Sequence, residues 1–141
     1  MEHPDGFYTM KGYELNAEDG LTSAMEDYLE MIARLTRQNE SVRVIDLSKM
    51  LHVKASSVTK MVQQLGQSGF IQAQKYGGIY LTDRGTEVGN YLLYRHEVIH
   101  RFLCTLNHSD NELEQVEKIE HFLDHTTVKN LELLTAHLAE K

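Results

Sequence analysis

The chain has 141 residues, of which 41% are hydrophobic and 25% are charged, a composition typical of a soluble globular protein and not of a disordered chain. No apolar run reaches the length of a membrane span, no signal peptide opens the sequence, and the single cysteine, Cys104, excludes an intramolecular disulfide. We therefore expect a cytoplasmic protein with one core or two small lobes.

The net charge of −7 is unevenly distributed along the chain. Residues 1–42 carry a net charge of −6, residues 43–84 a net charge of +4, and residues 85–141 a net charge of −5. A net negative charge argues against binding to nucleic acid. The basic segment between two acidic flanks nevertheless offers a local surface that could bind it.

The first 20 residues have no usable periodicity, and we interpret them as a flexible N-terminal arm. Ser23 and Glu26 then have the spacing of a capping box. The apolar residues that follow keep helical spacing, which predicts a first helix over about residues 23–38.

Two further helical patterns follow, separated by a tight turn near His52. The first is short and places Leu47 and Leu51 on one side, and the second places Val58 and Val62 on one side. A short helix, a tight turn and a second helix rich in Ser, Thr and Lys are typical of a helix-turn-helix.

A hairpin is predicted directly after these two helices. Short strands at about residues 70–74 and 79–82 flank a Gly-Gly pair at 77–78, which indicates a tight turn. A hairpin in this place predicts a winged helix, with Lys75 and Tyr76 at the tip of the wing.

A recognition helix needs short hydrogen-bonding side chains near its N-terminus, and basic residues around it bind phosphates. Any one of these residues is explained as well by a helix cap or a solvated surface. The helix-turn-helix, the wing and the basic segment together favour DNA. The candidate DNA-binding residues are Arg43, Lys54, Ser56, Ser57, Thr59, Lys60, Lys75 and Tyr76.

Helical patterns also account for the rest of the chain. A long helix is predicted over about residues 82–106. Ser109 and Glu112 form a second capping box that opens the next helix, and Thr126 or Thr127 caps a last one.

The segment VEKIEHFLDH, residues 116–125, carries an unusual group of charges. A helix would gather Glu117, Glu120 and His121 on one face, where the two carboxylates repel each other by about 0.2–0.5 kcal/mol. A divalent cation bound between them would turn this repulsion into coordination.

Two other predicted helices carry similar side chains. Asp27 and Glu30 lie three residues apart on the first helix, and His96 lies on the long helix. A helical bundle can direct such residues at one point. Carboxylate and imidazole donors without thiolate suit an octahedral metal such as Mn²⁺, with Fe²⁺, Co²⁺, Zn²⁺ and Cd²⁺ as competitors.

Each of these residues also has a simpler interpretation. Glu30 can form a surface ion pair with Arg34, His96 can be a hydrogen-bonded core histidine, and the residues of VEKIEHFLDH can be a solvated face. Spacing alone leaves the metal site and the surface equally open.

The segments SAMEDYLEMI, ASSVTKMVQQL, YRHE and VEKIEHFLDH, in this order, resemble the diphtheria-toxin-repressor family of metal-dependent regulators, most closely its short manganese-responsive members. The resemblance covers about residues 22–138. It implies a homodimer that binds an inverted-repeat DNA operator, two closely spaced ions per subunit, and neither enzymatic activity nor a small-molecule substrate. The metal ligands of the manganese branch match Asp27, Glu30, His96, Glu117, Glu120 and His121.

Two of these positions distinguish the branches of the family. In iron-responsive relatives the position of Asp27 is typically methionine, and that of Glu117 is typically cysteine. This sequence has a hard carboxylate at both, so the resemblance and the softness of the ligands agree on manganese.

We therefore expect a mainly α fold in three parts: a flexible arm (1–20), a winged helix-turn-helix DNA-binding domain with a small two-strand wing (21–84), and an all-helical dimerisation and metal-binding domain (85–141). The first helix also contributes ligands to the metal site. The expected function is Mn²⁺-responsive regulation of transcription, most simply repression of manganese uptake genes. Two alternatives stay open: a winged-helix regulator that senses another metal or a non-metal ligand, and a carboxylate-bridged metalloenzyme, which would leave the winged helix unexplained.

Overall fold

The computed structural model describes residues 20–38, 41–74 and 77–140. The predicted wing-tip residues Lys75 and Tyr76, and all but the last residue of the predicted arm, lie outside the described residues. In chain order the elements are α2 (Ser23–Gln38), α3 (Val44–Leu51), α4 (Ala55–Gln67), β1 (Ile71–Ala73), β2 (Ile79–Leu81), α5 (Asp83–Asn107), α6 (Leu113–Ile119), the 3₁₀ helix η1 (Glu120–Phe122) and α7 (His125–Ala139).

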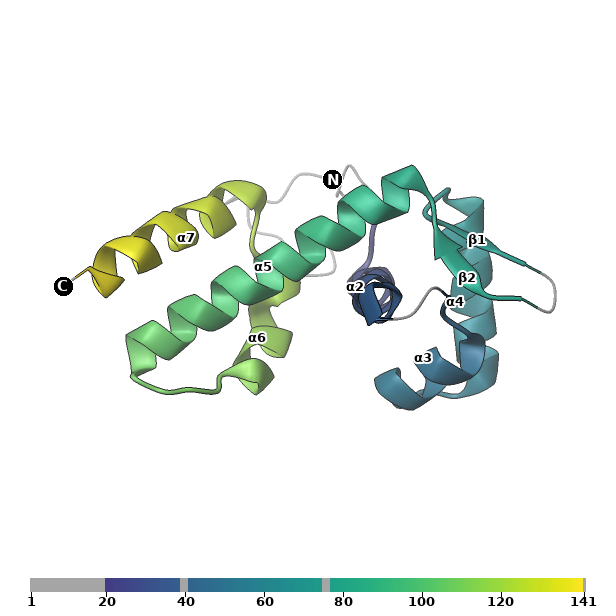
Figure 1. The fold of residues 1–141 in the computed structure, drawn as a ribbon, viewed down its shortest axis with the longest axis horizontal. Helices are drawn as coiled ribbons and strands as arrows, with labels where there is room; N and C mark the ends of the chain where they lie inside the picture. Colours follow the sequence, from purple (N-terminus) through teal and green to yellow (C-terminus); the bar gives the residue numbers. More distant parts are fainter. Residues whose placement is uncertain (1–19, 39–40, 75–76, 141) are drawn as a thin grey trace, which may run out of the picture.

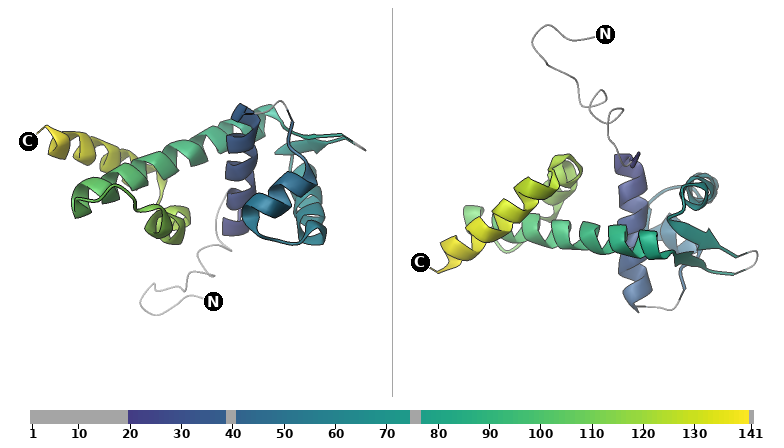
Figure 2. Two further views of the ribbon diagram at one scale, coloured as in Figure 1. Left: turned by 60° about the horizontal axis from the view of Figure 1, so that its bottom comes forward. Right: turned by 90° about the horizontal axis from the view of Figure 1, so that it is seen from above.

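The long helix α5 joins two groups of elements (Figure 1). At its N-terminal end lie α2, α3, α4 and the two strands, and at its C-terminal end lie α6, η1 and α7. Helix α2 crosses α5, and α7 packs along α5 on the other side of the molecule (Figure 2). No helix within the described ranges is both long enough and apolar enough to span a membrane.

The first group is a winged helix, as the sequence predicts. The turn between α3 and α4 places His52 in the left-handed region, with a φ of 56°, and its backbone N–H donates to Ser48. The strands β1 and β2 pair antiparallel, with Gln72 opposite Tyr80. The segment before α3 joins this hairpin, because the Ile79 N–H donates to the Val42 carbonyl at 2.6 Å.

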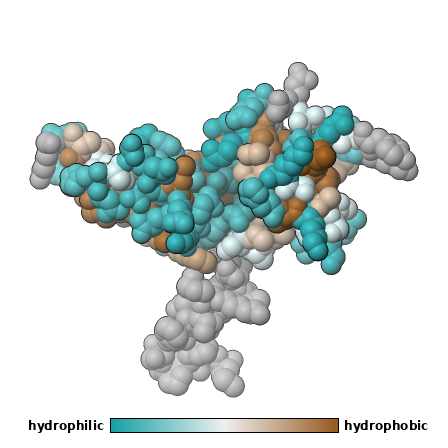
Figure 3. Space-filling model, turned by 90° about the horizontal axis from the view of Figure 1, so that it is seen from below, coloured by the Kyte–Doolittle hydropathy of each residue, from teal (hydrophilic) through white to brown (hydrophobic). Residues whose placement is uncertain are grey.

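The larger hydrophobic core lies in the winged helix and includes the start of α5. Seen from below, hydrophobic side chains reach the surface mainly over this half of the molecule (Figure 3). A second, smaller core lies between α5 and α6 and consists of Ile99, Leu103 and Val116. The residues of the larger core are Met25, Tyr28, Leu29, Ile32, Val42, Leu47, Val58, Val62, Leu65, Phe70, Ile71, Ile79 and Leu92.

The predicted capping box at the start of α2 is wrong. Thr22 caps the helix instead, because its Oγ1 accepts the backbone N–H of Met25 at 3.1 Å. The side chain of Glu26 turns away from the helix end and contacts Arg95 on α5.

Two helix starts near the C-terminus also differ from the predictions. Helix α6 begins at Leu113, with Glu112 at its N-cap position, and the Ser109 hydroxyl donates to the Glu112 side chain at 2.8 Å instead of capping the helix. Asp124 caps α7 by accepting the Thr127 N–H at 2.8 Å, so neither threonine is the cap.

Candidate metal centre

Three parts of the fold bring the six predicted metal ligands together. Helix α2 carries Asp27 and Glu30 one turn apart on the side that faces α5, and α5 carries His96. The remaining three ligands belong to the α6–η1 segment. They do not share one regular helix, because the chain tightens into a 3₁₀ turn at Glu120.

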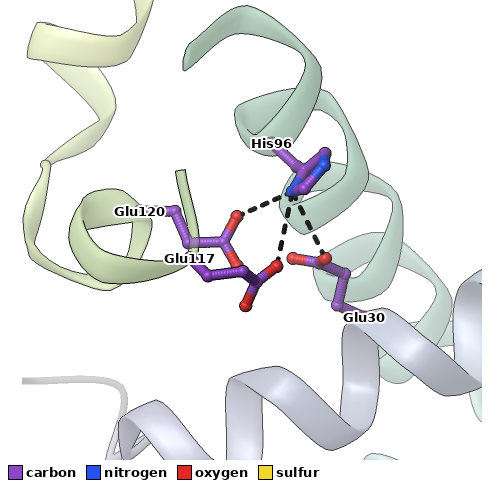
Figure 4. Close-up of side chains that lie close together, drawn as sticks. All are labelled: Glu30, His96, Glu117 and Glu120. Carbon is purple, nitrogen blue, oxygen red and sulfur yellow. Dashed lines mark hydrogen bonds and ion pairs between the residues drawn. The ribbon is translucent and has the colours of Figure 1, made fainter. Parts of the chain in front are cut away.

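The first group of ligands surrounds the His96 imidazole (Figure 4). Its Nδ1 lies 3.0 Å from Glu120 Oε2, 3.6 Å from Glu30 Oε2 and 3.9 Å from Glu117 Oε1. One donor atom from each of the four residues lies within 4.8 Å of every other. Such a group, drawn from three elements, is compact enough to hold one ion.

A second group adjoins the first and shares Glu120 with it. His121 Nε2 lies 2.9 Å from Asp27 Oδ1 and 3.9 Å from Glu120 Oε1. These three residues also place one donor atom each within 4.8 Å of one another. The structure therefore gathers all six predicted ligands into two adjacent groups with one shared carboxylate.

Burial differs strongly among the carboxylates of the centre. The Glu120 side chain is fully buried, and that of Glu30 is 10% exposed, whereas Asp27 and Glu117 remain 42% and 55% exposed. The buried atoms Glu30 Oε1 and Glu120 Oε1 have no hydrogen-bond partner among the described residues. Unpaired buried carboxylate oxygens are costly, and a hard divalent cation is a fitting partner for them.

The electrostatics of the centre reflect this crowding of acids. Burial, followed by the neighbouring charge of Glu120, raises the pKa of Glu30 to about 7. Burial and the charges of Glu120 and Asp27 likewise raise the pKa of Glu117. Each shift means that burial and the neighbouring acids destabilise the ionised carboxylate. A bound cation would stabilise that ionised form.

The pKa values of the two histidines are raised as well, which for a histidine favours the charged form. The hydrogen bond to Glu120 raises the pKa of His96. Burial alone would lower the pKa of His121, but hydrogen bonds to Asp27 and Glu26 and the charges of both raise it to about 10. A raised pKa favours the protonated form of each imidazole, whose positive charge offsets the neighbouring carboxylates.

The chain matches known protein families over nearly its whole length. Residues 20–79 match the family described as "Iron dependent repressor, N-terminal DNA binding domain". Residues 82–141 match "Iron dependent repressor, metal binding and dimerisation domain". The chain belongs to the iron-dependent repressor family. The resemblance to metal-dependent repressors that the sequence motifs indicate is thereby confirmed.

Relatives of this repressor-family chain include two proteins named HTH-type transcriptional regulator MntR. The protein from Geobacillus thermodenitrificans is 38% identical over 84% of this chain and 85% of its own length, and that from Bacillus subtilis is 37% identical over 84% of each chain. A structure of the manganese regulator SloR superposes with a TM-score of 0.70 at 28% identity over 80% of this chain. The repressor-family chain spans about half of SloR, since the match covers 54% of it. All three are regulators rather than enzymes.

The described candidate DNA-binding residues of this repressor-family chain lie on α4 or directly before α3 and α4, and all are exposed. Lys54 precedes α4, and all four candidates on that helix are exposed around the buried Val58. The hydroxyl of Thr59 donates to the Ala55 carbonyl at 3.1 Å, which leaves its lone pairs available as acceptors. Arg43 is exposed at the start of α3.

Sequence reasoning missed two residues beside the centre, Glu26 and Arg95. Arg95 Nη2 lies 3.2 Å from Glu26 Oε1, which also lies 2.8 Å from His121 Nδ1. A signal for Arg95 was present: it falls on the apolar stripe of α5, between Leu92 and Ile99, both of them buried. A charged residue in such a position requires a buried partner.

Proposed function

We propose that this chain is a Mn²⁺-responsive, homodimeric transcriptional regulator that represses manganese uptake genes in the cytoplasm. One observation carries the proposal: four carboxylates and two imidazoles from α2, α5 and the α6–η1 segment come together in a chain that also contains a winged helix. The family membership and the names of the relatives support the same function.

The metal centre would hold two ions per subunit. Glu30, His96, Glu117 and Glu120 would ligate one ion, and Asp27, Glu120 and His121 would ligate the other. Four hard carboxylates and two imidazoles, without a thiolate or a thioether, support Mn²⁺ over softer metals, with Fe²⁺, Co²⁺, Zn²⁺ and Cd²⁺ as competitors. The exposed carboxylates Asp27 and Glu117 offer the route by which ions enter from solvent.

Metal binding would fix the position of the winged helix. Helix α2 belongs to the winged-helix core, since Leu29 and Ile32 are fully buried there. The opposite face of the same helix carries Asp27 and Glu30. Ions held between α2, α5 and the α6–η1 segment therefore restrict how α2 sits on α5, and they favour the DNA-binding arrangement through their higher affinity for it.

The proposed dimer would form through α5, α6 and α7. Leu106, Leu113, Phe122, Leu133 and Leu134 in this part of the chain are between 46% and 58% exposed. Exposed apolar side chains of this size are available to bury in an interface. A two-fold dimer would present two winged helices, which matches an inverted-repeat operator.

The proposed boundaries are a DNA-binding domain over residues 21–84 and a dimerisation and metal-binding domain over residues 85–141. Phosphate contacts would come from Arg43, Lys54 and Lys75, and base contacts from the start of α4, where no acidic residue intervenes between Asp46 and Asp83. The proposed DNA-binding residues also include Ser56, Ser57, Thr59, Lys60 and Tyr76.

Selection of genomic DNA fragments on the purified protein tests this function and requires no assumed operator sequence. With Mn²⁺ present, we expect enrichment of an inverted repeat upstream of manganese transporter genes; with a chelator, we expect none. Enrichment only with Fe²⁺ or Zn²⁺ would identify a regulator of another metal. Enrichment that ignores metal altogether would overturn the proposal in favour of a non-metal signal.

A further inference from the structure

A buried ion pair adjoins the proposed centre without contributing a ligand to it. The Arg95 side chain is 3% exposed and that of Glu26 is 14% exposed. The Arg95 guanidinium approaches both oxygens of Glu26, with Nη2 at 3.2 Å from Oε1 and Nη1 at 3.5 Å from Oε2. The pair joins α5 to α2 one residue before His96 and one residue before Asp27.

The same carboxylate contacts His121, which comes from a third element. Glu26 Oε1 lies 2.8 Å from His121 Nδ1, and Arg95 Nη2 lies 3.4 Å from that nitrogen. The other ring nitrogen, Nε2, faces Asp27 at 2.9 Å and Glu120 at 3.9 Å. The imidazole is therefore held by Glu26 on the side away from the proposed ions, and its other nitrogen faces two proposed ligands.

This arrangement determines how His121 can bind a cation. A carboxylate that accepts the Nδ1 proton keeps that proton in place, so that the lone pair used for coordination is on Nε2. It also fixes the rotation of the ring. Arg95 in turn engages both Glu26 oxygens, which keeps this fifth nearby carboxylate from turning toward the ions and acting as a ligand itself.

We propose that Glu26 and Arg95 are positioning residues for the proposed metal centre: Glu26 orients His121 and selects its ring proton, and Arg95 holds Glu26 in place. The inference rests on the proposed function, because it assigns His121 to a metal ion. It goes beyond the ligand set, since neither residue would touch the metal.

Metal binding to three variants of the full chain tests the assignment, with Mn²⁺ for affinity and Co²⁺ for its visible absorption bands. Glu26→Gln removes the charge but keeps the shape. Glu26→Gln combined with Arg95→Met removes both buried charges, so no unpaired guanidinium remains to unfold the protein. The control is Glu97→Gln, which breaks the exposed ion pair between Glu97 and Arg101, 3.0 Å long and on the same helix.

We expect Glu26→Gln to weaken Mn²⁺ binding by about 10–100-fold, the usual effect of losing a group that orients a ligand, and to shift the Co²⁺ bands. The double variant should melt close to the wild-type temperature in chelator and still bind Mn²⁺ weakly. Glu97→Gln should match the wild type in all three measurements.

Other outcomes separate this inference from the function on which it rests. If the double variant binds Mn²⁺ as the wild type does, or does not fold, the pair is structural and the assignment is wrong. Wild-type affinity in Glu26→Gln would overturn it as well. If the wild type itself binds neither Mn²⁺ nor Co²⁺, the proposed function fails, and this inference fails with it.

Discussion

Glu120 Oε2 lies 3.0 Å from Nδ1 of His96, which links the 3₁₀ turn after α6 to the middle of the long helix α5. Glu120 is fully buried. A charged side chain is rarely placed so deeply without a partner of opposite charge. The contact therefore joins η1 to α5 at the point where the proposed ions would bind.

Mn²⁺ should raise the affinity of the protein for its operator by at least about tenfold, equivalent to about 1.4 kcal/mol of coupling between the two sites. The physical reason is that ions held between α2 and α5 restrict the winged helix. Fluorescence anisotropy of a labelled operator, with Mn²⁺ and then with chelator, measures the change. Glu120→Gln, which lies in both ligand groups, should lose the response, whereas equal wild-type affinities in both conditions would refute metal gating.

Lys60→Ala should weaken binding to every DNA sequence and lower the slope of log K against log salt by about one, because it removes one phosphate contact. Ser57→Ala should instead reduce the preference for the operator over unrelated DNA. Salt titrations on both kinds of DNA distinguish the two effects. Mn²⁺ binding should survive both substitutions, since both residues are exposed on α4; loss of metal binding in either would contradict this assignment.

Asp27→Met should lower the response to Mn²⁺ and keep or increase the response to Fe²⁺ or Co²⁺. The substitution removes a proposed anionic ligand, whose Oδ1 lies 2.9 Å from His121 Nε2, and supplies a softer thioether. Since Mn²⁺ is the weakest-binding of these metals, the site must select it through geometry and the number of oxygen ligands. DNA-binding titrations with each metal give the order of response.

Asp27→Met would behave differently if Asp27 had only a structural role. If Asp27 only interacts favourably with the N-terminal end of α2, its loss costs about 0.3–1 kcal/mol of stability and leaves the order of metals unchanged. An unchanged order would mean that Asp27 is not a ligand.

Leu134→Glu should dissociate the proposed dimer. Leu134 lies on α7 and is 46% exposed, and a charge buried at an apolar interface costs several kcal/mol. Sedimentation velocity at micromolar concentration reports the mass of the species. Ile45→Glu is the matched control, because Ile45 is 58% exposed but lies on α3 in the winged helix. A dimer that persists in Leu134→Glu would move the interface away from this face of α7.

Gly85→Ala should destabilise the protein by about 1–3 kcal/mol. A methyl group at this position, in the first turn of α5, would collide with the carbonyl oxygen of Phe70, which accepts the Thr82 N–H at 3.1 Å. Urea unfolding in chelator measures the effect. Gly66→Ala is the control: its nearest neighbour would be 3.9 Å away, so it should be neutral or stabilising by about 0.4–1 kcal/mol.

Helical periodicity grouped candidate ligands, because residues three and four apart share a face whatever surrounds the helix, but the family resemblance was needed to favour a metal site over a solvated surface. Asp27 and Glu30 on one helix, and Glu117 with Glu120 and His121 on another segment, were thus recognisable as groups. Periodicity did not predict the change to a 3₁₀ turn at Glu120, since hydrogen-bond spacing within one turn depends on the packing around it.

The role of Glu26 could not be predicted from local sequence patterns. Its spacing from Ser23 has the form of a capping box, a local pattern that competes with any partner brought close by tertiary structure. That partner, Arg95, is separated by 69 residues along the chain. Local patterns thus predict the helices and strands of this fold. The buried pair of Glu26 and Arg95 forms only where α2 and α5 cross, and local patterns do not predict that crossing.

The length of α5 has a mechanical consequence. The helix has 25 residues and is therefore about 37 Å long, and about 20 Å separate its start from His96. A tilt of only about 5° at His96 would move the start of the helix, and the winged helix packed on it, by roughly 1.7 Å. That is about half of the 3.4 Å rise between successive bases. In the proposed dimer, small rotations at the proposed ligands would thus become displacements large enough to bring the two recognition helices into or out of register with their half-sites.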